Sequence, residues 1–308
     1  MPTATAARIQ SPLVPVALGS LPAGTVVGSV ELTVTDLDRS IAFYCDGLGL
    51  AVHTRAAGRA VLGGDEQAAL VLVEEPEARR AGRHAGLFHV ALLYPTRLAL
   101  AQVAQRLGAL GIPIEGASDH GTHEAIYLPD PDGNGVEVAA DTPPATWPSY
   151  AEEFARSGPR PLDFDSLLAL VESSPPTAGA LGDIRIGHVH LHVADVEAAE
   201  RCYREVVGFD TMASIGSAAF VSAGGYHHHL AFNVWRGKGV PPQPAGTVGL
   251  RRWTLVVPSA ADVEAVRGRA TAADPAAAGG ATAAGAAATG DLLLHDPSGN
   301  ALLIVAAG

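Results

Sequence analysis

The sequence predicts an α+β fold made of four βαβββ modules, and three observations lead to this prediction. The segment that starts at Ser29 recurs at His188, with matching Asp, Tyr and Gly residues at a constant offset of 159. A tight Asp-Pro-x-Gly-Asn turn occurs at Asp130 and again at Asp296, and each time an apolar run typical of a strand follows. Each half divides once more into a strand, an amphipathic helix and further strands.

The elements of the modules can be placed in order. The four first strands are expected at 29–34, 88–93, 186–193 and 252–257. Apolar residues recur at i, i+3 and i+4 in the segments that follow, which predicts helices at 37–47, 97–110, 196–207 and 261–270.

The length of 308 residues favours two domains of about 150 residues each. We expect an extension over 1–24, an N-terminal domain of two modules over 25–141, a linker over 142–182 and a C-terminal domain of two modules over 183–308. Within the linker, a helix is expected near 150–157. The Ala-, Gly- and Thr-rich segment 272–290 is interpreted as an insertion before the last strands.

Composition excludes several classes of partner. The net charge is −12 and no basic patch occurs, which argues against nucleic acid. No apolar run approaches the roughly 18 residues of a membrane span, so we expect no membrane insertion. Cys45 and Cys202 lie in separate predicted helices, which argues against a disulfide and favours the cytoplasm.

Histidines gather in two places of the C-terminal half. Strand alternation puts His188, His190 and His192 on one face, which indicates either a hydrogen-bonded polar face or a metal site. A second group, 227–229, precedes an apolar run that should form the last strand of the third module. That group is either a surface cluster or a second wall of the same site.

His89 and Glu137 are weak signals when each is taken alone. A single His on an apolar strand is usually a core residue with satisfied hydrogen bonds, and an exposed Glu on a strand is common. The two gain weight together, because the first and last strands of a βαβββ module line the same concave surface.

Together, the repeated module, the first-strand His and a Glu seven residues after Asp130 resemble the vicinal-oxygen-chelate superfamily, which includes glyoxalase I, extradiol dioxygenases and antibiotic-resistance proteins. The resemblance covers nearly the whole chain. It implies two domains of this type with curved, half-barrel mixed sheets. Two-domain dioxygenases of the catechol 2,3-type match best, which implies Fe(II), with Mn(II), Ni(II) and Zn(II) as alternatives, bound by His188, His89 and Glu137.

The resemblance also implies the remaining roles. Tyr127 stands ten residues before Glu137, as the family's Tyr does. The family's acid–base His aligns best with His228. His229 is the second candidate, because the alignment of this segment can shift by one residue. His120 is the nearest match to a further His of the family that contacts substrate. The implied reaction is cleavage of a small aromatic diol by O₂ to a muconic semialdehyde, in the catabolism of aromatic hydrocarbons. Whether the chain forms a homo-oligomer stays open.

The sequence departs from the usual layout, in which the whole metal triad lies in the C-terminal half. Leu303 replaces the Glu there, Arg252 or Trp253 replaces the second His, and the N-terminal half has Ser29 where the first His should be. Neither half contains a complete triad. Either the second and third modules pair within the chain, or the site forms between subunits.

Two other functions stay open. A glyoxalase-I-like isomerase, commonly with Ni or Zn, would add His228 or His229 as a fourth ligand. A resistance-type protein would bind an aromatic ligand without catalysis, although such proteins usually lack metal-binding residues.

Overall fold

The structure is a computed structural model that describes residues 20–149, 158–176, 178–273 and 290–308. Most of the expected extension 1–24, the helix expected near 150–157 and most of the segment 272–290 lie outside the described residues.

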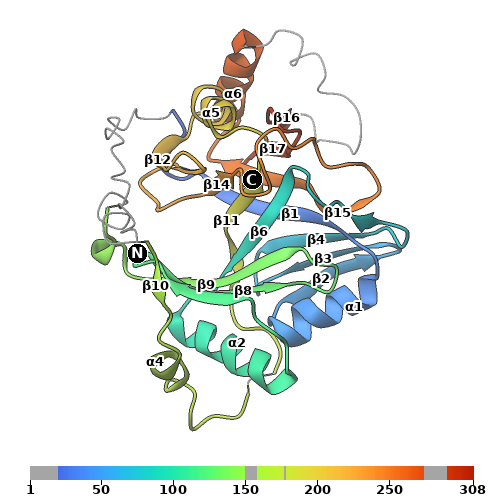
Figure 1. Cartoon of the computed structure of the whole chain (residues 1–308), viewed down its shortest axis with the longest axis vertical. Coiled ribbons are helices and arrows are strands. Elements are labelled where there is room, and N and C mark those ends of the chain that lie inside the picture. The colour runs from blue at the N-terminus through green and yellow to red at the C-terminus, as the bar shows by residue number, and fades with distance from the viewer. Residues whose placement is uncertain (1–19, 150–157, 177, 274–289) are drawn as a thin grey trace, which may run out of the picture.

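Two curved mixed sheets form the framework of the molecule, as the α+β prediction requires (Figure 1). In order across the first sheet, the strands are β16 (Leu292–His295), β17 (Ala301–Ala306), β15 (Thr247–Val257), β1 (Val26–Val34), β4 (Ala68–Glu74), β3 (Arg59–Gly63) and β2 (Ala51–Ala56), and β5 (Arg79–Arg80) pairs with β15. In order across the second sheet, they are β10 (Arg160–Pro161), β7 (Gly116–Asp119), β8 (His123–Pro129), β9 (Gly135–Asp141), β6 (Gly86–Leu93), β11 (Arg185–His192), β14 (Leu230–Asn233), β13 (Ala218–Ser222) and β12 (Asp210–Ser214).

Helices occur where the apolar periodicity predicts them. They are α1 (Leu37–Ala42), α2 (Arg97–Leu110), α5 (Val196–Arg201) and α6 (Ala260–Ala273), with short helical segments at α4 (Phe164–Leu168) and Pro144–Thr146. Asp36, Thr96 and Asp195 cap α1, α2 and α5, because each side chain accepts a hydrogen bond from a backbone N–H of the first turn. The helices α1 and α5 continue as π-helical segments, Phe43–Gly47 and Cys202–Val207, which the sequence pattern did not predict.

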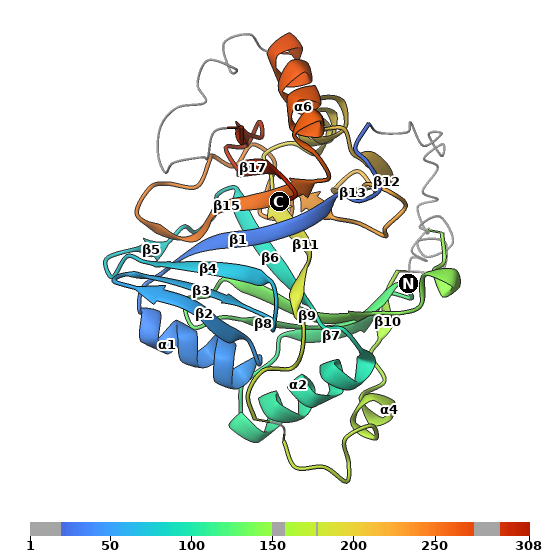
Figure 2. The same ribbon diagram turned by 180° about the vertical axis from the view of Figure 1, so that it is seen from behind.

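Each sheet combines one module from each half of the chain. Strand β1 pairs antiparallel with β15, and β6 pairs antiparallel with β11 (Figures 1 and 2). The second and third modules therefore pair within one chain, which is one of the two arrangements that the sequence left open. The division into domains at 25–141 and 183–308 stays a prediction.

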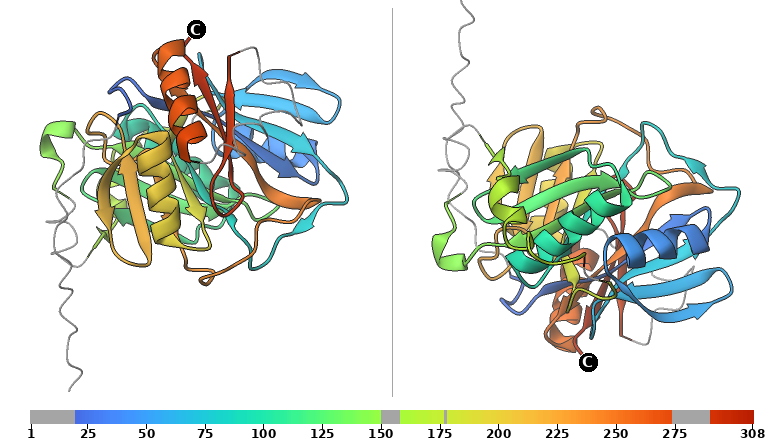
Figure 3. Two further views of the ribbon diagram at one scale, coloured as in Figure 1. Left: turned by 90° about the horizontal axis from the view of Figure 1, so that it is seen from above. Right: turned by 90° about the horizontal axis from the view of Figure 1, so that it is seen from below.

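The helices hold the modules of each half together. The π-helical segment after α1 packs against α2, and the one after α5 packs against α6. Seen from above and from below, these two helical pairs cover opposite ends of the molecule (Figure 3).

The repeated Tyr and Asp residues meet inside each half. Tyr44 donates a hydrogen bond to Asp130 Oδ2 over 3.1 Å, and Tyr203 donates to Asp296 Oδ2 over 3.0 Å. Within the first Asp-Pro-x-Gly-Asn turn, Asp130 also accepts from the backbone and side chain of Asn134. Burial raises the pKa of Asp130, and these hydrogen bonds only partly offset the effect. The repeat thus places one buried Tyr–Asp link in each half.

Candidate metal centre

His89, Glu137 and His188 lie on three adjacent strands in the middle of the second sheet. His89 is on β6, Glu137 on β9 and His188 on β11, and Ala91 of β6 pairs with both Glu137 and His188. The ladder between β6 and β11 contains two register shifts, which re-aim side chains as β-bulges do beside functional sites. The three side chains are buried.

The donor atoms of these residues form a tight triangle. His89 Nε2 lies 3.3 Å from His188 Nε2, and Glu137 Oε2 lies 3.1 Å from the former and 3.3 Å from the latter. With bonds of about 2.1 Å, adjacent ligands of an octahedral ion are about 3.0 Å apart. The triangle therefore fits one face of such an ion and leaves the opposite face for other ligands. Among the described residues, this is the one group of three such side chains whose donor atoms all lie within 4.8 Å.

The protonation of the group suits a cation. Burial alone raises the pKa of Glu137, but the neighbouring His188, His123 and His89 outweigh it and hold this pKa well below its usual range. Burial lowers the pKa of His188, with Glu137 partly offsetting the effect, so this imidazole is neutral near pH 7. A carboxylate and a neutral imidazole are the forms that bind metal.

A chain of hydrogen bonds sets the tautomer of His228. His227 Nε2 lies 3.0 Å from Asp141 Oδ1 and must donate, because a carboxylate only accepts. Burial lowers the pKa of His227 to about 3, with Asp141 partly offsetting it, so the ring is neutral and its Nδ1 accepts from His228 Nδ1, 3.0 Å away. The proton of His228 is thereby assigned to Nδ1, and its Nε2 is the basic nitrogen. The ring centroids of His228 and His188 are 4.1 Å apart.

His229 has different surroundings from His228. Its Nδ1 lies 2.9 Å from Ser222 Oγ and accepts a hydrogen bond of 3.2 Å from the backbone N–H of Ala223. Its ring lines a cavity of about 170 Å³ together with Arg185 and Tyr226. Of the two histidines that the sequence proposed for acid–base chemistry, His228 is therefore the one packed against the triad.

Tyr127 and His120 form the side of the site along β8. Tyr127 pairs directly with Glu137 across the β8–β9 ladder, and its ring centroid lies 5.6 Å from that of His89. His120 Nε2 lies 2.7 Å from the Tyr127 hydroxyl. The structure thus places both residues beside the candidate triad, and their contact with substrate stays a prediction.

The sequence reasoning missed His123. Its Nε2 lies 3.2 Å from Glu137 Oε1, and its ring stacks between His120 and His227, with centroids 4.5 Å and 4.8 Å away. A usable signal was present, since His123 and Tyr127 are an even number of residues apart on one strand and therefore share its face.

His190 and His192 form a hydrogen-bonded polar face beside the site. Asn233 Nδ2 donates to His190 Nε2 over 2.8 Å, and His192 Nδ1 lies 2.9 Å from Asn233 Oδ1. Of the two interpretations of the histidine strand, the polar face thus describes these two residues. His188 alone joins the triad.

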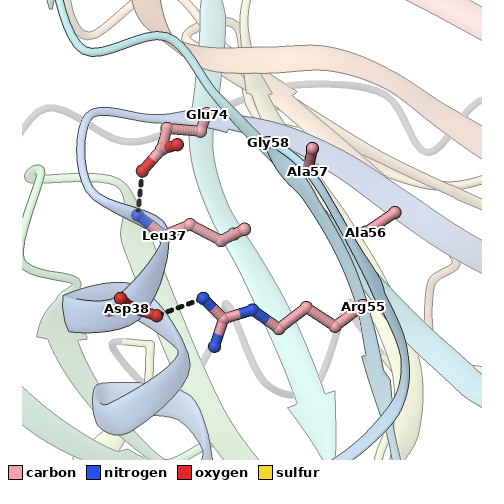
Figure 4. Close-up of a pocket in the computed structure, with 7 residues that line it drawn as sticks. All are labelled: Leu37, Asp38, Arg55, Ala56, Ala57, Gly58 and Glu74. Atoms are coloured by element: carbon pink, nitrogen blue, oxygen red, sulfur yellow. Dashed lines mark hydrogen bonds and ion pairs between the residues drawn. The ribbon is translucent and has the colours of Figure 1, made fainter.

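The first sheet carries ion pairs where the second carries the triad. Glu31 of β1 lies 2.9 Å from Arg59 and 3.1 Å from Arg251. Outside this face, a surface hollow of about 500 Å³ between α1 and the β2–β3 hairpin contains the ion pair of Asp38 with Arg55 (Figure 4). Neither place contains a group of metal donors among the described residues.

In the described part of the chain, no helix is long and apolar enough to span a membrane.

Comparisons with known proteins agree with the fold and with the repeat. The chain matches the Glyoxalase/Bleomycin resistance protein/Dioxygenase superfamily twice, at residues 26–138 and 185–304. It is 39% identical to catechol-2,3-dioxygenase of Bacillus subtilis (strain 168) over 250 residues, which cover 80% of this chain and 87% of that protein.

Solved structures show the same fold at low sequence identity. Glyoxalase I from Zea mays superposes with a TM-score of 0.54 at 16% identity, covering 92% of both chains. The cppA protein from Streptococcus pneumoniae TIGR4 superposes with a TM-score of 0.56 at 13% identity, covering 95% of this chain and 100% of the other. The two sequence matches span well over half of the chain, and the protein therefore belongs to the Glyoxalase/Bleomycin resistance protein/Dioxygenase superfamily.

Proposed function

We propose that the protein is an extradiol ring-cleaving dioxygenase that binds Fe(II) through His89, Glu137 and His188. The observation that carries this proposal is the triangle of donor atoms, with edges of 3.1 to 3.3 Å, on one side of a buried site. Three protein ligands on one face leave about three positions, enough for both oxygens of a catechol and for O₂.

The comparisons and the donor count favour this function over the alternatives. The similarity to a catechol-2,3-dioxygenase supports a catechol-type diol as the substrate. A glyoxalase-I-like isomerase would need a fourth protein ligand, whereas the donor group among the described residues has three members. A resistance-type binding protein has no use for a buried triad of this kind.

The residues around the triad would have two roles, proton transfer and positioning of the substrate. Bound Fe(II) would supply the Lewis-acid and redox chemistry of ring cleavage. Tyr127, with its hydroxyl held by His120, is placed to hydrogen-bond a substrate oxygen. His228 Nε2 would accept the proton of a catechol hydroxyl and later return it, while Asp141 and His227 keep the opposite nitrogen protonated.

The overall reaction is balanced by the diol and O₂ alone. The ring carbon–carbon bond beside the two hydroxyls breaks, both oxygen atoms of O₂ enter the product, and a muconic semialdehyde forms. Proton transfers through His228 cancel over the cycle, so the protein returns to its starting state.

The test uses the metal-free protein, loaded anaerobically with Fe(II) and mixed with catechol and air. We expect oxygen uptake and a yellow ring-opened product, both lost in His188→Ala and Glu137→Ala and retained in the exposed control His295→Ala. Parallel loading with Mn(II), Ni(II) and Zn(II) identifies the active metal. Turnover of a hemithioacetal with Ni(II), without oxygen uptake, would contradict the proposal and support the isomerase.

A further inference from the structure

We propose that His123 is a positioning residue that fixes Glu137 as a one-oxygen ligand of the metal. This inference rests on the proposed metal site and goes beyond it, because His123 is not one of the ligands. The donor group within 4.8 Å contains His89, Glu137 and His188 alone among the described residues. What His123 contacts is the other oxygen of Glu137.

The two oxygens of Glu137 have different neighbours. Oε2 faces the Nε2 atoms of His89 and His188, at 3.1 Å and 3.3 Å. Oε1 is buried and has no hydrogen bond of regular geometry, although His123 Nε2 lies only 3.2 Å away. The contact is short, but its angle is not that of a regular hydrogen bond. A buried carboxylate oxygen without a donor is costly, and His123 Nε2 is the nitrogen within reach of this one.

The surroundings of His123 select the tautomer that this role needs. Its Nδ1 lies 2.9 Å from the hydroxyl of Thr122, which can donate to an unprotonated ring nitrogen. A neutral imidazole with an accepting Nδ1 carries its proton on Nε2, the atom that faces Glu137. The Thr122 hydroxyl and the Glu137 carboxylate thus favour the same tautomer.

Stacking fixes the plane of the ring. His120 lies parallel to it on one side, with an interplanar angle of 10°, and His227 lies on the other at 14°. His227 is itself held by Asp141, and His120 by Tyr127. Rotation of the ring out of this plane would break both stacks, so Nε2 stays next to Glu137 Oε1.

The consequence concerns the coordination positions left for substrate. A carboxylate with both oxygens free can bind through two atoms and occupy a further position on the ion. A donor on Oε1 disfavours this mode and keeps that position available. Partners of this kind hold ligands in place, and their loss commonly weakens metal binding by about 10- to 100-fold.

The test separates the donor from the ring. His123→Phe keeps a flat ring between His120 and His227 but has no N–H, whereas His123→Gln keeps an N–H donor at similar reach. Metal-free forms of the full chain are titrated with Co(II), whose visible spectrum reports its coordination. We expect His123→Phe to bind Co(II) about 10- to 100-fold more weakly with an altered spectrum, and His123→Gln to stay within about threefold of the parent protein.

Two results would overturn the inference. One is His123→Phe with the affinity and spectrum of the parent protein. The other is His123→Gln as weak as His123→Phe, because an N–H donor at this position would then not restore Co(II) binding. Should His123→Phe fail to fold by circular dichroism, Thr122→Val decides. A loss of several-fold supports the role, and unchanged Co(II) binding refutes it.

The outcome is also separable from that of the proposed function. The dioxygenase proposal would be refuted if Co(II) binding needs His89, Glu137 and His188 but the Fe(II)-loaded protein does not cleave catechol. The effect of His123 on Co(II) binding would stand in that case.

Discussion

His228 and His229 are neighbours in sequence but have different surroundings. His228 packs on His188 with ring centroids 4.1 Å apart, while His229 bonds to Ser222 and Ala223. The sequence could not choose between the two residues. The segment 226–229 precedes β14 without being a regular strand, so the alternation that places side chains on strands does not apply to it.

Replacing each histidine in turn should therefore affect catalysis very differently. We expect His228→Gln to lower kcat for catechol cleavage by about 10²- to 10⁴-fold, the usual contribution of a general acid–base group. His229→Asn, which keeps an acceptor for Ala223, should stay within about threefold in kcat. Steady-state oxygen uptake measures both variants. Equal losses in the two, or a loss confined to His229→Asn, would contradict the assignment of the base to His228.

At the scale of single residues, the three residues that the sequence grouped do lie together, because regular strands carry them. Their role as metal ligands stays a prediction. His89, Glu137 and His188 all lie in strands with a clear apolar pattern, where alternation fixes the face. His123 was not predicted because the family resemblance implies one further His before Tyr127, and His120 matches that place. The contact of His123 with Glu137 depends on pairing between β8 and β9, which spacing along the chain does not express.

Among the secondary-structure elements, the helices followed their periodicity and the turns their Asp-Pro-x-Gly-Asn signature. The π-helical ends of α1 and α5 were not predictable, since a π turn leaves no distinct apolar period. Each of these segments contains the Tyr of the repeat, and its hydroxyl reaches the Asp of the following module's turn. A link between two elements of each half therefore depends on one hydroxyl.

We expect these Tyr–Asp links to contribute to the stability of the fold. Tyr44→Phe removes a hydrogen bond to the buried Asp130 and should lower the free energy of unfolding by roughly 1 to 3 kcal/mol. Tyr203→Phe should have a similar effect through Asp296. Urea unfolding of the two single variants and of the double variant measures this. Losses below about 0.5 kcal/mol in both would show that the links carry little of the stability.

At the scale of the whole molecule, the sequence predicted four modules but not how they pair. The pairing of modules depends on which first strands meet. The repeat would allow β1 to pair with β6, joining the first and second modules, just as well as the observed pairing of β6 with β11. The structure joins the second and third modules in one chain, so His188 from one half completes His89 and Glu137 from the other.

Mixing two inactive variants tests this arrangement. His89→Ala and His188→Ala chains, co-expressed with different tags, should stay inactive together, because neither chain has a complete triad. If the sites formed between two subunits, random pairing would make half of the dimers mixed, and one of the two sites in each mixed dimer would be complete. About a quarter of the activity would then be restored. The recovered activity of the mixed sample, compared with the parent protein, distinguishes the two outcomes.

Acid should destabilise the whole molecule because it contains buried neutral histidines. Burial, with smaller effects of Arg185 and His188, lowers the pKa of His229 to about 4, from 6.5 in the unfolded chain. A lowered pKa means that the folded state resists protonation, so its stabilising effect is complete above pH 6.5 and is lost as the pH falls towards 4.

The expected size of this effect for His229 is up to about 2 kcal/mol between pH 7 and pH 5. Urea unfolding at the two pH values should show a smaller loss in His229→Asn than in the parent protein. An equal loss in both proteins would mean that His229 does not contribute to the acid sensitivity.

Anaerobic titration of the metal-free protein with Fe(II) tests most directly whether one chain holds one metal ion through three residues from both halves. We expect one tight site per chain, weakened by at least about 100-fold in each of His89→Ala, Glu137→Ala and His188→Ala. A second tight site in the parent chain, or tight binding that survives the loss of His188, would contradict it.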